Sequence, residues 1–255
     1  MKILDSNEYI NEKLNIKPFT KDKLSKMKEE PSVDENTRKF IEVNNLKWNL
    51  KTMSYDCEGD VIVSKDIVID GKLKIRFGEV DGDFFCSNHN LTTLKGAPNE
   101  VGGDFGCRNN RLTSLEGAPQ EVGGCFYCTY NELTSLKGAP NKVGLEFDCS
   151  GNKLTTLEGA PNEVGGDFVC NNNKLTSLEG APQEVGGGFY CNNNRLTTLE
   201  GAPQKVGGDF SCSFNKLANL DGAPQKVEGD LYYNGNPNLV LPKTKPSWLK
   251  GKTIN

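Results

Sequence analysis

The stretch VGGDFGCRNNRLTSLEGAPQE, from Val101 to Glu121, is one copy of a 21-residue unit that recurs through the middle of the chain. Its register is marked by seven cysteines that follow one another at intervals of 21 residues: Cys86, Cys107, Cys128, Cys149, Cys170, Cys191 and Cys212. A fixed period of about 20–29 residues is typical of solenoids, in which each repeat forms one coil. One coil cannot bury its apolar side alone, whereas stacked coils share a continuous core. The repeat therefore predicts a β-rich solenoid.

Alignment of the copies separates apolar columns from variable ones. The apolar columns contain Val101, Phe105, Cys107, Leu112, Leu115 and their equivalents in the other copies. Phe and Cys are two residues apart, so we expect both to point to the same side of a short strand. An Asn follows each cysteine by three residues, from Asn110 to Asn215, and His89 takes this place in the first copy. We expect this inward Asn to satisfy backbone groups that are left unpaired where the strand ends.

The other half of each coil carries no helix signal. Gly-Ala-Pro, as at 117–119, breaks a helix and favours a turn. Gly-Gly pairs such as 102–103 are expected to let the backbone turn tightly into the next strand. These patterns predict an extended or turn-like convex side and one continuous parallel sheet, with rungs ~4.8 Å apart.

The pattern F-x-C-x-x-N-x-L-x-x-L resembles the leucine-rich repeat. Over residues 80–239 the fuller pattern N-x-L-T-x-L-x-G-A-P-x-x-V-G-G resembles the leucine-rich repeat proteins that many tailed bacteriophages and some bacteria encode. The resemblance implies a right-handed coil with a parallel β-sheet on the concave face and little helix in the repeats. The chain departs from the pattern locally at Cys125, Leu145, Glu146, Gly188, Ala218 and Glu228.

We expect four segments along the chain. Residues 1–33 form a flexible or loosely helical N-terminal segment, 34–79 a small α/β cap with a divergent first coil, 80–239 the solenoid and 240–255 a C-terminal cap or tail. Terminal coils need a non-repeating cover over the open core. Within the N-terminal cap we predict a short helix from Asp34 to Val43, with Phe40 and Val43 facing inward and Ile41 as a candidate beside them.

The charge is unevenly distributed. The chain has 34 Asp and Glu against 30 Lys and Arg, and the excess of acid lies in 51–239. A negative surface repels phosphate, which argues against nucleic-acid binding, and it favours a basic protein partner. No apolar run approaches the ~20 residues that cross a bilayer, and the first residues lack the apolar stretch of a signal peptide. We therefore expect no membrane association and a cytoplasmic location, which is the host cytoplasm for a phage protein, with the virion as the alternative location.

No combination of residues predicts chemistry. A cysteine spacing of 21 does not match the short ligand spacings of zinc or iron–sulfur motifs, so we interpret the cysteines as buried core. Cys125 and Cys128 are three apart on a strand and should face opposite sides, which leaves Cys125 accessible. His89, the one histidine, has no fitting nucleophile and is expected to be a hydrogen-bonded structural residue. The sequence predicts no enzyme, no catalytic residue, no metal and no cofactor.

The functional signal lies on the exposed side of the strands, where acidic and aromatic residues recur. The candidate partner-binding residues are Asp83, Phe85, Asp104, Tyr127, Tyr130, Glu146, Asp167, Tyr190, Asp209, Phe214, Asp230 and Tyr232. Exposed aromatics amid polar groups are typical of interface anchors. Alternatively, the aromatics stack across rungs to stabilise the sheet, and the acidic residues bond local backbone amides.

Our leading hypothesis is a non-enzymatic protein–protein interaction module, phage-encoded by resemblance, whose acidic and aromatic face binds a basic protein. The alternative is a structural virion or assembly component that the N-terminal segment tethers. The sequence leaves the oligomeric state open.

Overall fold

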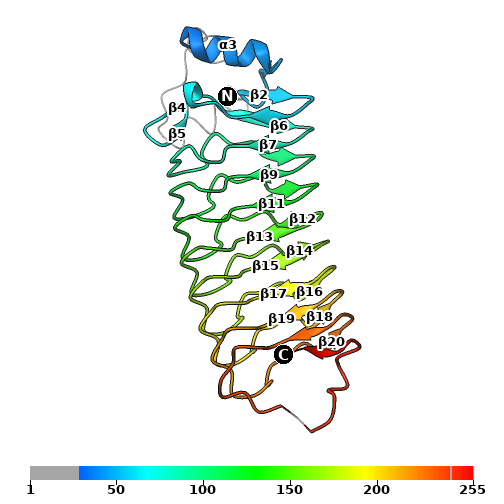
Figure 1. The fold of residues 1–255 in the computed structure, drawn as a ribbon. Helices are drawn as coiled ribbons and strands as arrows, with labels where there is room; N and C mark the ends of the chain where they lie inside the picture. Colours follow the sequence, from blue (N-terminus) through cyan, green and yellow to red (C-terminus); the bar gives the residue numbers. More distant parts are fainter. Residues whose placement is uncertain (1–28, 242, 255) are drawn as a thin grey trace, which may run out of the picture.

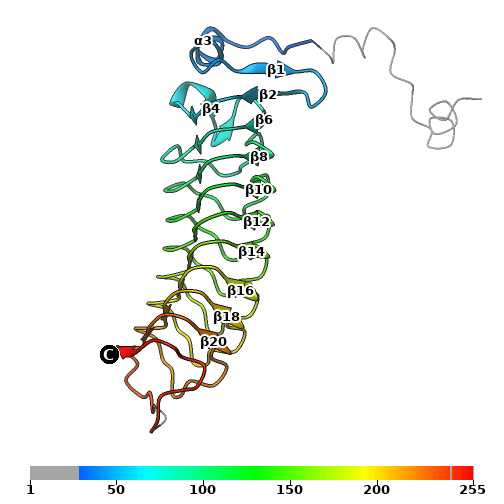
Figure 2. The ribbon, with the colours of Figure 1, turned by 90° about the vertical axis from the view of Figure 1, so that its right-hand side faces the viewer.

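The computed structural model describes residues 29–241 and 243–254, which form a parallel β-solenoid of about nine turns. Figures 1 and 2 show the coils stacked into an elongated body, with one short helix at the N-terminal end. The predicted fold class is confirmed, and the coils contain little helix. The prediction of a flexible or loosely helical segment over 1–33 falls almost entirely outside the described residues.

Each repeat contributes two short strands, which belong to two separate ten-stranded sheets. Sheet A consists of β1 (Lys47–Asn49), β2 (Ser54–Cys57), β6 (Phe77–Val80), β8 (Glu100–Val101), β10 (Glu121–Val122), β12 (Lys142–Val143), β14 (Glu163–Val164), β16 (Glu184–Val185), β18 (Lys205–Val206) and β20 (Lys226–Val227). Sheet B consists of β3 (Val61–Ile62), β7 (Phe84–Phe85), β9 (Phe105–Gly106), β11 (Phe126–Tyr127), β13 (Phe147–Asp148), β15 (Phe168–Val169), β17 (Phe189–Tyr190), β19 (Phe210–Ser211), β21 (Leu231–Tyr232) and β22 (Thr253–Ile254). Sheet A was not predicted, because only the Val of each of its repeat strands is apolar.

Equivalent residues of successive coils pair in register. Phe126, for example, lies opposite Phe105 on one side and Phe147 on the other. The phenylalanine rings from Phe84 to Phe210 form a continuous stack, with centroids 5.0–5.7 Å apart and planes within 20° of each other. The cysteine and leucine columns are buried beside them. The core is thus a set of parallel rows, as the 21-residue period predicts.

The Gly-Gly pairs lie where neighbouring coils approach each other closely. A Cβ on Gly123 would overlap the carbonyl oxygen of Gly102, and a Cβ on Gly124 would overlap the carboxylate of Asp104. Neither glycine has a positive φ. The left-handed conformation occurs instead at the Gly of Gly-Ala-Pro, such as Gly117 with φ 92°. The backbone bends at the Gly-Gly pair as predicted, and the pair has a second role that was not predicted: it lets the neighbouring coil come close.

The presence of Leu145 at a glycine position has a related cause, namely what the preceding coil places beside it. It occupies the position of the second glycine and is 54% exposed. In most other coils the Asp of the preceding coil fills the space beside that glycine, as Asp104 does beside Gly124. The coil before Leu145 has Cys125 in place of the Asp, so no carboxylate occupies this space. The loss of the Asp at Cys125 therefore permits Leu145 but does not require it, because Gly188 also replaces an Asp and the next coil keeps its glycine, Gly208.

The N-terminal cap contains the predicted short helix, α3 (Glu35–Val43). It begins after Asp34, whose carboxylate accepts a hydrogen bond of 2.9 Å from the Thr37 amide. That bond and the ion pair with Lys74 lower the pKa of Asp34 to about 2. Phe40 faces inward as predicted, and its ring meets that of Phe77 edge to face at 6.5 Å.

The inward orientation predicted for Val43 was wrong, because its side chain is 76% exposed. The buried face of α3 consists of Thr37, Phe40 and Ile41, which the helical period places together. The helix leads into the antiparallel pair of β1 and β2. The 3-10 turn η1 (Lys65–Ile67) and the antiparallel pair of β4 (Val68–Ile69) and β5 (Lys72–Leu73) follow within the first coil.

The C-terminal end is closed by a last pair of parallel contacts. Strand β22 pairs with β21, and Leu249 forms a bridge to Val227 and is buried. Glu228 contacts Lys226 and Lys250 and so fastens this segment to β20. These two lysines lower the pKa of Glu228 to about 2.

Candidate interaction face on sheet B

The outer side of sheet B and the turn that follows its strands carry the twelve candidate residues. On each strand the Phe and the following Cys point into the core, so the residues before and after the Phe point outward. We define three rows that run along the stack. The acidic row is Asp83, Asp104, Cys125, Glu146, Asp167, Gly188, Asp209 and Asp230; the aromatic row is Phe85, Gly106, Tyr127, Asp148, Val169, Tyr190, Ser211 and Tyr232; the turn row is Asn88, Asn109, Tyr130, Gly151, Asn172, Asn193, Phe214 and Gly235.

Carboxylates of the acidic row take part in the fold. One oxygen of Asp104 accepts a hydrogen bond of 2.7 Å from the backbone amide of Cys125, one coil further on. The same bond to the next coil is made by Asp83, Asp167, Asp209 and Asp230, at 2.6–2.8 Å. The alternative of a local role is therefore supported for these five residues. Their charge nevertheless stays at the surface, because each side chain is only partly buried.

The face formed by these three rows is rich in carboxylates. The three rows contain seven carboxylates and no Lys or Arg. Burial, together with the charges of Asp148 and Asp167, raises the pKa of Glu146 above its ordinary value. Burial and then the charges of Asp167 and Asp209 raise the pKa of Tyr190 in the same way. Burial is the largest cause of both shifts; the neighbouring carboxylates add to them, and Arg108 offsets part of the effect on Glu146.

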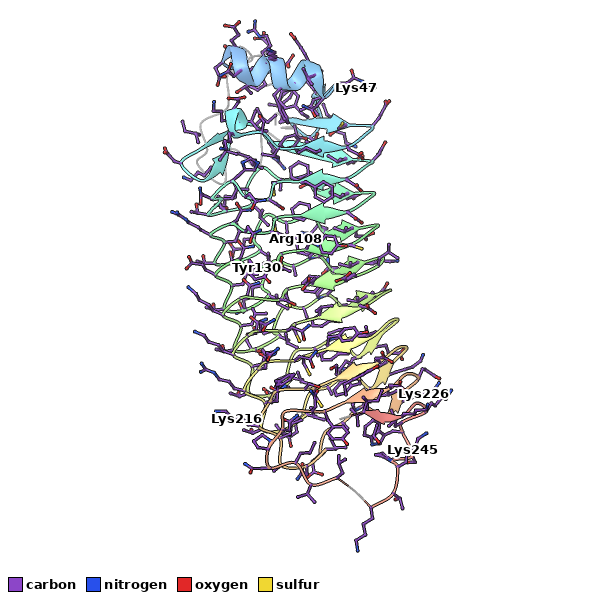
Figure 3. The ribbon with its side chains drawn as sticks, viewed as in Figure 1. Lys47, Arg108, Tyr130, Lys216, Lys226 and Lys245 are labelled. Atoms are coloured by element: carbon purple, nitrogen blue, oxygen red, sulfur yellow. The ribbon has the colours of Figure 1, made fainter. Side chains whose placement is uncertain are left out.

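One cation lies beside the aromatic row. The guanidinium carbon of Arg108 is 3.7 Å from the centroid of the Tyr127 ring, a cation–π contact. Arg108 follows Cys107, so it comes from the coil before Tyr127. Figure 3 labels Arg108 and Tyr130 near the middle of the stack.

Three aromatic side chains cover glycines of the next coil. The rings of Phe85, Tyr130 and Phe214 lie where a Cβ would stand on Gly106, Gly151 and Gly235, respectively. Cross-coil packing, the second interpretation of the aromatics, therefore accounts for part of these three. Tyr127, Tyr190 and Tyr232 cover no such glycine of the next coil and are partly buried.

The turn row lies just beyond the strands and has a conformation of its own. Its Asn residues have φ between 53° and 64°, and its two glycines have φ 69° and 71°. Asn and Gly are the residues that adopt this left-handed region most readily. Tyr130 and Phe214 adopt it too, with φ 54° and 56°, and are 64% and 53% exposed. A bulky residue there is uncommon, which makes these two the most unusual side chains of the face.

The inward polar residues confirm their predicted structural role. The side chain of Asn131 donates hydrogen bonds to the carbonyls of Cys107 and Cys128 at 3.0 and 3.2 Å, and accepts one from the Leu112 amide at 3.0 Å. The same pattern repeats from Asn110 to Asn215. His89 Nε2 lies 2.8 Å from the carbonyl oxygen of Val63.

The cysteine column is closed to solvent. All seven ladder thiols are fully buried, and burial raises the pKa of Cys86 and Cys212 to about 12. Cys125 is partly exposed while Cys128 is buried, so the two thiols face opposite sides as predicted.

We expect a thiol reagent at about pH 8 to modify one cysteine of the native chain rapidly, because only the thiolate reacts. That cysteine is Cys125, and the other eight, all buried, should react only on unfolding. The measurement is the number of fast-reacting thiols in native protein, in protein unfolded in urea and in Cys125→Ser. Two or more fast thiols in the native chain would contradict the buried column.

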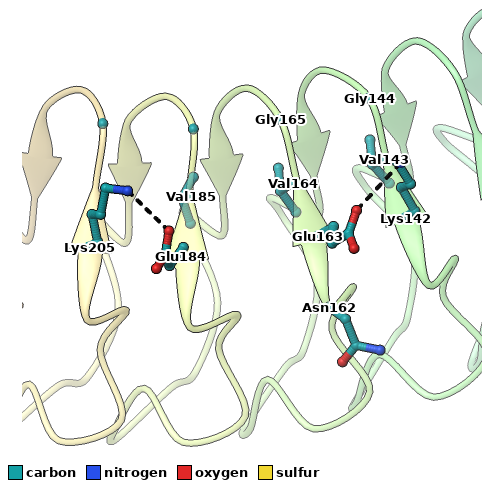
Figure 4. A pocket seen from close by; sticks show the side chains of 12 residues that line it. Lys142, Val143, Gly144, Asn162, Glu163, Val164, Gly165, Glu184, Val185 and Lys205 are labelled. Atoms are coloured by element: carbon teal, nitrogen blue, oxygen red, sulfur yellow. Dashed lines mark hydrogen bonds and ion pairs between the residues drawn. The ribbon is translucent and has the colours of Figure 1, made fainter.

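Sheet A offers a shallow hollow rather than a site for a small molecule. A depression of about 530 Å³ lies over Val143, Val164, Gly144 and Gly165, and Figure 4 shows its lining. Ion pairs join the side chains along it: Lys142 to Glu163 at 3.5 Å, and Lys205 to Glu184 at 3.2 Å. None of the twelve candidate residues lies in this hollow.

The part of the chain that the structure describes contains no cluster of three or more His, Cys, Asp or Glu that could hold a metal ion. No helix in that part is long and apolar enough to cross a bilayer. A comparison of the chain with family models, with curated proteins and with solved structures found no match.

Proposed function

We propose that the protein is a non-enzymatic interaction module that binds a basic protein surface through the outer face of sheet B. One observation carries this proposal. Seven carboxylates and the six aromatic candidates lie on one face, and the three rows that form this face contain no Lys or Arg. By the resemblance of its repeats, we place the protein among phage-encoded or bacterial leucine-rich repeat proteins that act in a cytoplasm.

A basic partner suits the electrostatics of this face. Successive coils bring like charges about 4.8 Å apart, and the local hydrogen bonds use one oxygen of a carboxylate while its charge persists. Burial contributes most to the raised pKa of Glu146, and the charges of Asp148 and Asp167 add to it; lysine or arginine side chains of a partner would relieve this repulsion. Such pairing also steers the approach of the partner and makes association sensitive to salt.

The aromatic side chains supply the contact area. Tyr127, Tyr190 and Tyr232 each add a ring and a hydroxyl that can serve a partner, as tyrosine does at interfaces. Tyr130 and Phe214 are the most exposed of the aromatic candidates. Because every one of these side chains is anchored on a stacked coil, little conformational entropy is lost on binding.

The test separates charge from fold. Asp104→Asn, Asp167→Asn and Asp209→Asn together remove three charges and keep the side-chain oxygen that accepts the next amide. We expect unchanged thermal stability and at least a tenfold loss of affinity, estimated from ~0.5–1 kcal/mol per rim charge, for a lysine-rich peptide measured at low salt.

Glu121→Gln, Glu163→Gln and Glu184→Gln together on sheet A remove the same number of charges and should keep the affinity, which makes this variant the matched control. Equal affinity of the Asp104, Asp167 and Asp209 variant and the wild type would overturn the acidic row as a recognition surface. The Tyr127→Ala, Tyr190→Ala and Tyr232→Ala variant tests the rings in the same assay, and in capture of partners from host lysate. Retention of the partner by this variant would refute the aromatic anchors.

A further inference from the structure

The third side of each coil, between the turn row and Gly-Ala-Pro, carries a second charge pattern. Leu112 and Leu115 of one such side point into the core, while Arg111, Thr113 and Glu116 are exposed. We define the first row as Asn90, Arg111, Glu132, Lys153, Lys174, Arg195 and Lys216; the middle row as Thr92, Thr113, Thr134, Thr155, Thr176 and Thr197; and the last row as Lys95, Glu116, Lys137, Glu158, Glu179, Glu200 and Asp221. Every residue of the three rows is exposed. Figure 3 shows Lys216 on the side away from the strands.

From Arg111 onward the first row is basic and the last row is acidic, with one exception. In a single coil the first row has Glu132 and the last row has Lys137. The two charges are thus reversed together. Each of these six coils therefore presents one cation and one anion, on opposite sides of the threonine row.

Contacts within one molecule use this pattern only in part. Lys153 pairs with Glu132 at 3.0 Å, and Lys137 pairs with Glu158 at 3.2 Å, each within a single row. Among the described residues, no carboxylate forms an ion pair with the remaining cations of the first row: Arg111, Lys174, Arg195 and Lys216. Three of these follow one another at coil spacing, so like charges stand about 4.8 Å apart in backbone position.

We infer that two copies of this chain associate through the third side, coil against equal coil. A two-fold axis parallel to the stack and running along the threonine row places the first row of each copy opposite the last row of the other. Lys174 then faces Glu179 of the second copy. The same operation brings Glu132 opposite Lys137, so the reversed coil is complementary too.

The reversed coil also specifies the alignment. A shift by one coil sets Glu132 against Glu158 and Arg111 against Lys137 of the second copy. A two-fold axis across the stack sets first row against first row, which brings the cations together. The parallel, unshifted pair is therefore favoured over both alternatives by charge.

The size of this side predicts a weak, salt-sensitive association. Seven coils at ~4.8 Å and five residue steps at ~3.3 Å give a patch of roughly 550 Å² per copy. Stable interfaces bury about 800 Å² per partner. Exposed ion pairs contribute little each and are screened by salt. We therefore expect the dimer at high protein concentration and low ionic strength.

Sedimentation of the full chain tests this inference. We expect a monomer–dimer equilibrium at about 20 mM salt that shifts to monomer at about 500 mM salt. The two-fold axis creates two contacts between Lys174 and Glu179 in each dimer. Lys174→Glu or Glu179→Lys alone therefore places like charges opposite one another at both contacts and should weaken the dimer about tenfold or more. The double variant recreates the arrangement of the Glu132 coil and should restore the affinity to within about threefold.

The matched controls are Lys205→Glu, Glu184→Lys and their combination on sheet A, which make the same charge changes and pair with each other. These should leave the dimer affinity unchanged. A chain that stays monomeric at low salt overturns the inference. If Lys174→Glu leaves the dimer affinity unchanged, or if the double variant does not restore it, the proposed face and alignment are wrong.

Cross-linking reads the orientation directly. In a Cys125→Ser background we expect both Thr134→Cys and Thr197→Cys to form a disulfide with the same position of the second copy, because the axis runs along the whole threonine row. A two-fold axis across the stack would allow self-cross-linking at one position only. Cross-linking at only one of the two, or at neither, overturns the parallel arrangement.

Discussion

Replacing Phe147 by alanine is expected to lower the free energy of unfolding by about 4 kcal/mol. Phe147 is fully buried, and its ring lies 5.4 Å from that of Phe126 and 5.3 Å from that of Phe168. The substitution removes the ring from the middle of the stack and leaves a cavity against both neighbours. Because each coil contacts only its neighbours, no distant part of the chain can fill that space.

The measurement is urea unfolding followed by circular dichroism, with Val169→Ala as control. Val169 lies on the outer face of the same sheet and should cost less than about 1.5 kcal/mol. The weakened middle coil should also broaden the transition, since the two halves of a repeat stack can unfold separately. A loss below about 1 kcal/mol for Phe147→Ala would contradict a continuous ring stack.

Replacing Asn173 by aspartate is expected to lower the free energy of unfolding by about 3 kcal/mol or more at pH 7. The Asn173 amide donates to the carbonyls of Cys149 and Cys170, both at 3.2 Å, while its oxygen accepts from the Leu154 amide at 3.0 Å. Aspartate keeps the acceptor but turns a negative oxygen toward two buried carbonyls. The loss should shrink at about pH 4, where a protonated carboxyl can donate again.

The neighbouring Asn172 provides the control. It belongs to the turn row, with φ 56°, and is exposed. Asn172→Gly keeps a residue that favours this conformation, so the free energy of unfolding should change by less than about 0.5 kcal/mol. Equal effects of the two substitutions, measured in the same urea titration, would refute the distinct roles of the two asparagines.

The run Asn171–Asn173 illustrates what the repeat pattern could predict and what it could not. The period identified Asn173 as inward and structural, because it recurs three residues after each cysteine. The left-handed turn at Asn172 and the bond from the Asn192 amide to the Asn171 side chain, at 2.7 Å, were not predicted. Both depend on how the chain turns and on which atoms of the next coil come near, and three adjacent residues of one type do not reveal that.

The candidate face shows the same division. Ten of the twelve residues lie on the outer side of sheet B, because the residues that flank an inward Phe or Leu must point outward, whereas Tyr130 and Phe214 lie in the turn beyond the strands. Their second role came from contacts between coils: Asp104 bonds the next backbone amide, and Tyr130 covers Gly151. The paired charges of the third side were overlooked, because a net charge for the segment 51–239 averages a basic row with an acidic one.

The amino-acid sequence by itself determined that coils of 21 residues stack and which side chains are buried, because apolar residues at a fixed period can leave water together only in shared rows. The tertiary structure alone decided that two sheets form instead of one, that the Gly-Gly pair admits the neighbouring coil, and that Asp carboxylates join successive coils. Those features arise where backbones about 20 residues apart in the chain come within hydrogen-bond or van der Waals distance. Such contacts are set by the path of each coil, which no single repeat specifies.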